Sequence, residues 1–192
     1  MAQDGGRGPA KRDSATTVKV VEVGPNPESI GGISSHVNSL SSGLKHRGYE
    51  VVNVYGPRRS GLSAVFEIPR YLSDLQEASD HARLIHFHGS RWGKLALGGF
   101  APRVVGGSAA ASQRLVLSIH SASFYSGRPY RKYLDSLTSV FGRVLVMSEG
   151  VRSQLAEYLS PINHAKVVAC SPFVPARPRQ SPRSNVARPI IC

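Results

Sequence analysis

The sequence predicts an α/β fold built on a single doubly wound, Rossmann-like parallel sheet. Three observations support this prediction. Short β-branched segments alternate with segments of helical periodicity, and glycine or proline separates many of them. The β-branched segments are also near-continuous apolar runs, which is typical of strands buried on both faces. The pattern covers residues 18–174, flanked by a basic head at 1–17 and a Pro/Arg-rich linker or tail at 175–192, both expected to be disordered.

The first half of this region predicts three strands and two helices. "VKVVEVG" at 18–24 is a first strand, and residues 33–44 then carry apolar side chains at helical spacing, with Gly48 as the stop. "YEVVNVYG" at 49–56 is a second strand. Pro69 occupies a favoured first-turn position for the next helix, and "ARLIHFHG" at 82–89 is the third strand.

The second half repeats the alternation. A Gly-rich helical stretch is expected from Trp92, followed by a strand in "RLVLSIHS" at 114–121. Pro129 then begins a helix, and "GRVLVMS" at 142–148 is the next strand. Ser148 is expected to cap a helix over 149–159. A last short strand lies in "AKVVACSPFVP" at 165–175, which completes the units of a parallel sheet.

The composition excludes several classes of protein. No run of about 18 apolar residues is present, so no membrane-spanning segment is expected, and the N-terminus lacks the apolar core of a signal peptide. The only cysteines, Cys170 and Cys192, fit a reducing cytoplasm. The net charge of +12 favours polyanions, anionic membrane surfaces or phosphorylated ligands as partners. Nucleic acid is disfavoured because zinc-finger spacing and RNP-like aromatic motifs are missing.

The loop after the first strand ends in Gly31 and Gly32, directly before a helix. Backbone N–H groups there can approach an anion, and the helix dipole favours negative charge. The alternative is that the two glycines only permit a turn. The dinucleotide signature and the P-loop pattern are both missing, which argues against the standard NAD and ATP sites.

Histidines gather at the predicted strand ends. His86 and His88 are two residues apart, so their side chains share one face of a strand, and His120 closes the next strand. The alternative is that each makes only backbone contacts. A three-histidine metal site is disfavoured because no acidic residue is recognised beside these three. His36 is assigned to the first helix, outside the group.

These segments, in this order, resemble one known family. "GGISSHVNSLSSGLKHRGYEVVNVYG", "ARLIHFHG", "RLVLSIHS" and "RVLVMSEGVRSQLAEYL" are similar to the N-terminal domain of GT-B fold, family 4 glycosyltransferases. The resemblance implies transfer of a sugar from a nucleotide-diphosphate sugar to a glycan or lipid-linked acceptor, with retention at the anomeric carbon. It also implies no cofactor and usually no metal.

The resemblance carries roles to particular residues. His120 matches a histidine that contacts the transferring sugar and is therefore the expected catalytic residue. Gly31 and Gly32 match the glycine-rich loop facing the donor diphosphate and the acceptor. The remaining expected substrate-binding residues are His86, His88, Ser121, Ser148 and Glu149. Ser121 departs from the glycine or threonine of many relatives, which puts acceptor choice in doubt.

The family's second, donor-binding domain is expected to be missing. After Pro175 the sequence has no room for the Arg/Lys pair and Glu-x7-Glu motif of that domain. The expected explanations are a truncated protein, a split enzyme with a separate donor-domain subunit, or a divergent end from a disrupted reading frame. One alternative is a non-catalytic module that binds a sugar phosphate or a partner. Another is a basic nucleic-acid or membrane-surface protein, with the Arg-rich tail as its footprint. For a transferase that acts on lipid-linked acceptors, peripheral docking at the inner face of the membrane is expected, with Arg58 and Arg59 as candidate contacts. The alternative for these two residues is a solvated surface loop.

Overall fold

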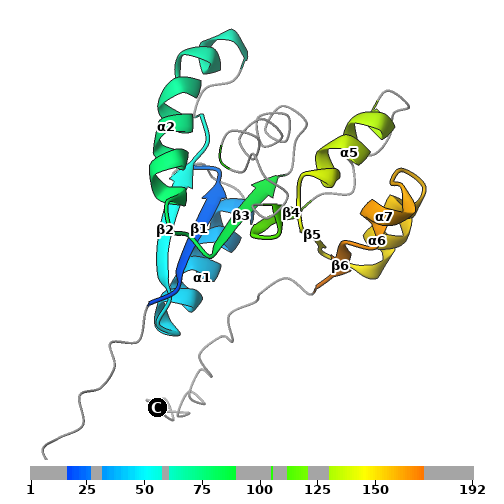
Figure 1. The fold of residues 1–192 in the computed structure, drawn as a ribbon, viewed down its shortest axis with the longest axis horizontal. Coiled ribbons are helices and arrows are strands. Elements are labelled where there is room, and N and C mark those ends of the chain that lie inside the picture. Colours follow the sequence, from blue (N-terminus) through cyan, green and yellow to red (C-terminus); the bar gives the residue numbers. More distant parts are fainter. Residues whose placement is uncertain are drawn as a thin grey trace, which may run out of the picture.

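Six strands form one sheet. The computed structural model describes residues 17–26, 32–57, 61–89, 105, 112–120 and 130–170 (Figure 1). The strands are β1 (Lys19–Gly24), β2 (Glu50–Tyr55), β3 (Leu84–Gly89), β4 (Leu115–Ile119), β5 (Arg143–Val146) and β6 (Val167–Ala169). Neighbouring strands pair in parallel in the order β2-β1-β3-β4-β5-β6. The predicted doubly wound, Rossmann-like α/β fold is confirmed.

The helices follow most of the predicted start and stop signals. They are α1 (Gly32–His46), α2 (Ile68–Ser79), α5 (Tyr130–Ser139), α6 (Glu149–Ala156) and α7 (Pro161–His164), with a 3-10 helix η1 (Gly61–Phe66). Gly48 follows α1 with a φ of +86°, which glycine adopts readily. Pro69 lies in the first turn of α2. The Ser148 hydroxyl caps α6 by accepting a hydrogen bond from Val151 N at 3.3 Å.

Three helical predictions need correction or lie outside the described residues. The helix predicted over 149–159 ends at Ala156, and a separate short helix, α7, begins at Pro161 because proline fits a helix start. The 3-10 helix η1 was not predicted. The helical stretch from Trp92 and the helix start at Pro129 fall outside the described residues. No helix in the described ranges is long and apolar enough to cross a membrane.

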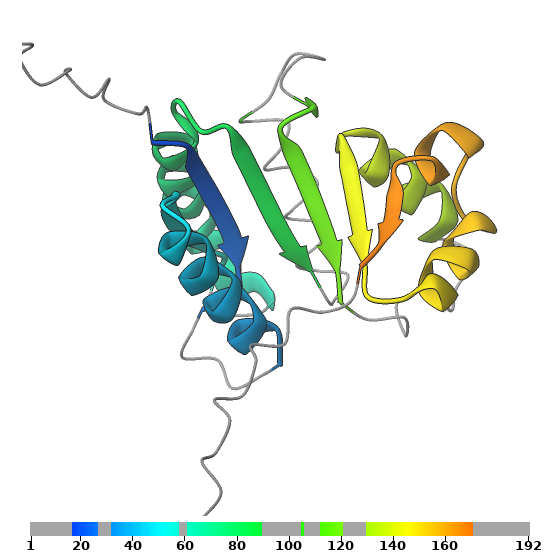
Figure 2. The same ribbon diagram turned by 90° about the horizontal axis from the view of Figure 1, so that it is seen from below.

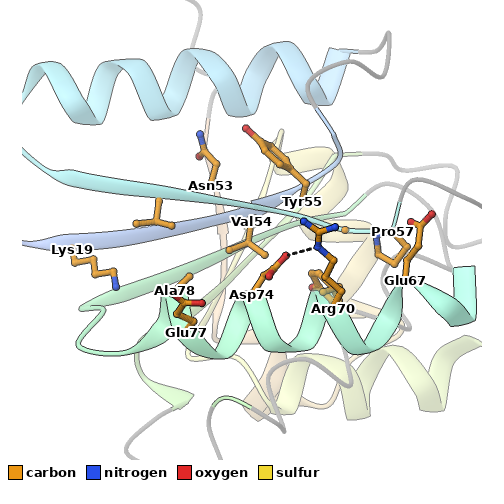
Figure 3. Close-up of a pocket in the computed structure, with 13 residues that line it drawn as sticks. Lys19, Asn53, Val54, Tyr55, Pro57, Glu67, Arg70, Asp74, Glu77 and Ala78 are labelled. Carbon is orange, nitrogen blue, oxygen red and sulfur yellow. Dashed lines mark ion pairs between the residues drawn. The ribbon is translucent and has the colours of Figure 1, made fainter.

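The two faces of the sheet differ in character. Helices α1 and α2 lie on opposite sides of β1 and β2 (Figures 2 and 3). Alternate strand residues on the α2 side form the apolar core with side chains from α2 and α5; its fully buried members include Val21, Ile85, Leu115, Leu117, Leu75 and Phe141. The other set of alternate residues, on the α1 side, includes Glu22, His86, His88 and Ser118, all buried. The sheet therefore has one apolar face and one partly polar face.

Replacing Gly142 by alanine is expected to destabilise the sheet by about 1–3 kcal/mol. A Cβ atom at Gly142 would lie 2.8 Å from Ser112 O and 2.9 Å from Gln113 Cα, and backbone atoms cannot rotate away. Gly150→Ala is the matched control, because its Cβ would meet only Ser148 Oγ at 3.8 Å and alanine favours the helix by up to about 1 kcal/mol. Urea unfolding measures both, and equal effects of the two substitutions would contradict this packing.

Candidate functional site

The buried polar side chains gather at the point where the strand order reverses. The chain runs from β1 outward to β2 and then crosses back to β3, so β1 and β3 are neighbours at the switch point. In open α/β sheets, ligands bind beside the carboxyl ends of strands at such a point. Glu22 of β1 is in register with His86 of β3, and His88 is in register with Ser118 of β4. His120 follows β4 by one residue. We call Glu22, His36, His86, His88 and His120 the histidine cluster.

Glu22 is the centre of the hydrogen bonds in the histidine cluster. Its Oε2 atom lies 2.7 Å from His88 Nε2 and 3.1 Å from His86 Nδ1. The other ring nitrogen of His86, Nε2, lies 2.7 Å from Ser118 Oγ. The other ring nitrogen of His88, Nδ1, lies 3.0 Å from His120 Nε2. A continuous chain therefore leads from the buried carboxylate to the half-buried His120.

Burial and mutual contact fix the charge states in this cluster. Burial alone would raise the pKa of Glu22, but the hydrogen bonds with His86 and His88 outweigh it and lower that pKa to about 2. Burial, followed by the neighbouring charge of His86, lowers the pKa of His88 to about 4, against the opposing effect of Glu22. Burial and the neighbouring histidines lower the pKa of His120 to about 3. At neutral pH, Glu22 is ionised while His88 and His120 are uncharged.

These charge states give the hydrogen-bond chain a direction. An ionised carboxylate only accepts hydrogen bonds, so His86 Nδ1–H and His88 Nε2–H both donate to Glu22. Neutral His88 then has a bare Nδ1, to which His120 Nε2–H donates. The Nδ1 atom of His120 is left as an acceptor for a ligand. The cluster thus orients a neutral imidazole at the carboxyl edge of the sheet.

His36 of α1 completes the histidine cluster from the helix side. Its ring centroid lies 5.0 Å from that of His120 and 6.0 Å from that of His88, in edge-to-face arrangements. Burial, together with the charge of His86, lowers the pKa of His36 as well. The side chain is half-buried, so it borders the solvent-accessible end of the cluster.

The expected site residues fall into three groups. His86, His88 and His120 contact one another, as their positions at the strand ends predicted. Gly32 begins α1, and Ser148 and Glu149 begin α6, so these residues follow the carboxyl ends of β1 and β5. The exposed Glu149 pairs with Arg152 at 3.0 Å and has no contact with the cluster among those the structure describes. Gly31, Ser121, Arg58 and Arg59 lie outside the described residues.

Sequence reasoning missed two members of the histidine cluster. The expectation that no acidic residue joins the histidines is wrong, because Glu22 reaches them from the middle of β1. His36, assigned to the helix alone, also joins them. The signal for Glu22 was a single acidic residue flanked by valines inside a strand, since charged groups are seldom buried without a partner.

A separate pocket of about 730 Å³ lies between β2 and α2 (Figure 3). Its walls carry side chains of both charges; those drawn near its rim include Lys19, Glu67, Arg70, Asp74 and Glu77. Arg70 and Asp74 approach to 3.9 Å within it. No member of the histidine cluster lines this pocket, so it is distinct from the candidate site.

No protein-family model matches the chain, and no curated protein matches it.

Proposed function

We propose that this chain is the acceptor-side half of a retaining glycosyltransferase that transfers a sugar from a nucleotide-diphosphate sugar to a glycan or lipid-linked acceptor. The observation that carries the proposal is the directed chain from Glu22 through His88 to His120. It ends at the carboxyl edge of a doubly wound sheet, where such folds bind ligands. In the family 4 enzymes that the sequence resembles, the histidine that matches His120 contacts the transferring sugar.

His120 is proposed to contact the sugar and to orient it. Its ring is fixed by the hydrogen bond to His88. Its Nδ1 has no hydrogen-bond partner among the residues that the structure describes and is an acceptor for a sugar hydroxyl. Fixing a substrate close to its reactive geometry removes part of the entropic barrier to reaction. Glu22 and His88 act through His120 and are positioning residues in this scheme.

The start of α1 is proposed to meet the diphosphate. The N-terminal N–H groups of a 15-residue helix attract anions, and no acidic residue opposes this in its first turn. A Cβ atom at Gly32 would meet nothing within 4 Å among the residues that the structure describes. The leaving group is the nucleoside diphosphate, which gains charge on its β-phosphate as the bond to the anomeric carbon breaks. Hydrogen-bond donors aimed at that phosphate therefore stabilise the transition state.

A second domain is proposed to grip the nucleotide. Binding a nucleotide sugar costs free energy because the ligand loses translational and rotational freedom. Contacts at a single anion site offset little of this cost, so the chain alone is expected to bind UDP-glucose or GDP-mannose only weakly. The proposed partner is a separate chain that supplies the opposite wall of the site. A membrane-bound acceptor would bring the basic chain to an anionic surface, where each lysine or arginine contributes about 1 kcal/mol.

The test is sugar transfer with and without a donor-domain partner. The purified chain, membrane extract and radiolabelled UDP- and GDP-sugars are expected to give transfer only when the partner is added. His120→Asn is then expected to lower transfer by about 100-fold, since misplacement of a bound substrate has effects of that size. His46→Asn, at the exposed end of α1, is the matched control and leaves the rate unchanged.

Two outcomes would contradict the proposal. Robust transfer by the chain alone would show that the donor-binding groups lie in this chain. Transfer at the unaltered rate in His120→Asn would show that the histidine cluster does not touch the sugar.

A further inference from the structure

Three imidazoles of the histidine cluster converge on one point. His36 comes from α1, His88 from β3, and His120 from the end of β4. One nitrogen atom from each ring lies within 4.8 Å of the other two. His36 and His120 are half-buried while His88 is buried, so the point is reachable from solvent but backed by protein.

We propose that His36, His88 and His120 bind a divalent transition-metal ion of the zinc type, each through one ring nitrogen. Zinc–nitrogen bonds are about 2.0–2.1 Å long, which places the nitrogens of a tetrahedral site about 3.3 Å apart. His88 Nδ1 and His120 Nε2 are already 3.0 Å apart. Small rotations of His36 and His120 therefore bring the three nitrogens to bonding distance of one ion.

Glu22 prepares His88 as a metal ligand. A metal-binding histidine usually donates its second ring N–H to a carboxylate or carbonyl, which fixes the ring and makes the binding nitrogen more basic. His88 donates Nε2–H to Glu22 at 2.7 Å and directs Nδ1 toward His120. A metal is disfavoured from the sequence alone because this acidic support comes from the pairing of β1 with β3, which local patterns do not reveal.

The neighbouring group of Glu22, His86 and His88 is a poorer metal site. All three residues are buried, and Glu22 Oε2 already accepts hydrogen bonds from both rings at 3.1 and 2.7 Å. An ion between them would have to replace both contacts without access to solvent. The half-buried trio requires only that the hydrogen bond between His88 and His120 be replaced.

Three histidines leave one position of a tetrahedral ion open. Such a position takes water or an anionic oxygen, as in catalytic rather than structural zinc sites. The proposed ligand for that position is a phosphate oxygen. His36 lies in the helix α1, and the N-terminus of this helix also favours anions. The metal site does not depend on the proposed sugar transfer. An ion bound to His120 Nε2 would fix that ring in place of the hydrogen bond to His88, and His120 Nδ1–H would then donate to a ligand instead of accepting from it.

The test is metal binding by the full chain, prepared without a histidine tag and stripped with a chelator. Titration with Co²⁺ is expected to give visible ligand-field absorption that saturates at one ion per chain, and Zn²⁺ is expected to displace it. His36→Ala removes a half-exposed ligand from a helix surface and is expected to weaken binding at least tenfold. His46→Ala, on the same helix, is the matched control and is expected to bind as the parent does.

Glu22→Gln retains all three histidine ligands and tests the hydrogen bond from His88 Nε2–H to the Glu22 carboxylate. It is expected to weaken Co²⁺ binding by about 10–100-fold, the usual effect of losing such a carboxylate. The proposal is overturned if the parent chain binds no Co²⁺, or if His36→Ala and His120→Ala bind it as tightly as the parent. No sugar nucleotide is present, so either result is independent of the test for glycosyl transfer.

Discussion

Glu22→Ala is expected to lower the free energy of unfolding by about 3 kcal/mol or more at neutral pH. His86 and His88 each donate a hydrogen bond to this carboxylate, and all three side chains are buried. Each buried donor left without an acceptor costs about 1–3 kcal/mol, and the deleted side chain also leaves a void. Burial of the carboxylate opposes this loss, but its lowered pKa shows that the two imidazoles more than offset that cost.

Glu22→Gln is expected to cost less, about 1–2 kcal/mol. The amide retains one acceptor oxygen for His88. His86 can respond by moving its hydrogen to Nε2, because Ser118 Oγ lies 2.7 Å away and accepts it. Glu50→Ala, at the exposed start of β2, is the matched control and should stay within about 0.5 kcal/mol of the parent.

Urea unfolding in chelator-containing buffer measures the series. The expected order of stability is parent, then Gln, then Ala at position 22. An alanine variant as stable as the Glu50→Ala control would show that the buried hydrogen bonds contribute nothing to folding.

Acidification is expected to destabilise the chain from about pH 6.5 downward, well before ordinary carboxylates titrate. The unfolded chain binds protons at its histidines near the ordinary pKa of 6.5, whereas the pKa of folded His88 is about 4 and that of folded His120 about 3. The unfolded state therefore binds more protons throughout this window, and stability falls as pH falls. His88 alone accounts for about 3 kcal/mol between pH 6.5 and 4.

Neighbouring groups in the histidine cluster modify this acid response. Glu22 extends it to lower pH, because its pKa of about 2 lies below the ordinary 4.5, so its contribution is lost between those values. His120 and His88 share a hydrogen bond, so their contributions do not add independently. His36 and His86 face the same space, and a proton on either raises the cost of charging the others.

The measurement is the free energy of unfolding at pH 7.5, 6.5, 5.5 and 4.5 in the presence of a chelator. His120→Asn should flatten the dependence on pH, because one of the groups that protonates only on unfolding is gone. His46→Asn should leave the slope unchanged. A parent chain with constant stability between pH 7.5 and 5 would refute the neutral, buried state assigned to these rings.

The sequence predicted the strands better than the site. Each strand is a short β-branched run bounded by turn residues, and local signals such as Gly48, Pro69 and Ser148 placed the helix boundaries. The separation of α6 from α7 was missed because the apolar periodicity of 149–159 continues past the point where the helix ends.

Prediction of the whole histidine cluster requires the strand pairing and the packing of α1, which a linear sequence does not give. His86 and His88 share a face by simple alternation, and parallel strands bring His120 to the same edge. Glu22 joins them only because β1 pairs with β3 in the register that sets Glu22 beside His86. His36 joins only because α1 packs on that face, and neither strand pairing nor the face chosen by a helix follows from local periodicity.

The partly polar face of the sheet beneath α1 also affects the register in which the strands pair. Glu22 on β1, His86 and His88 on β3, and Ser118 on β4 meet only when all three strands pair in one register. A slip of one residue in β3 would turn both imidazoles into the apolar face and leave Glu22 charged and unpartnered. In a strand with only apolar side chains, the same slip would cost little free energy, since one buried valine would replace another. The cluster therefore specifies strand register during folding, before any ligand is present.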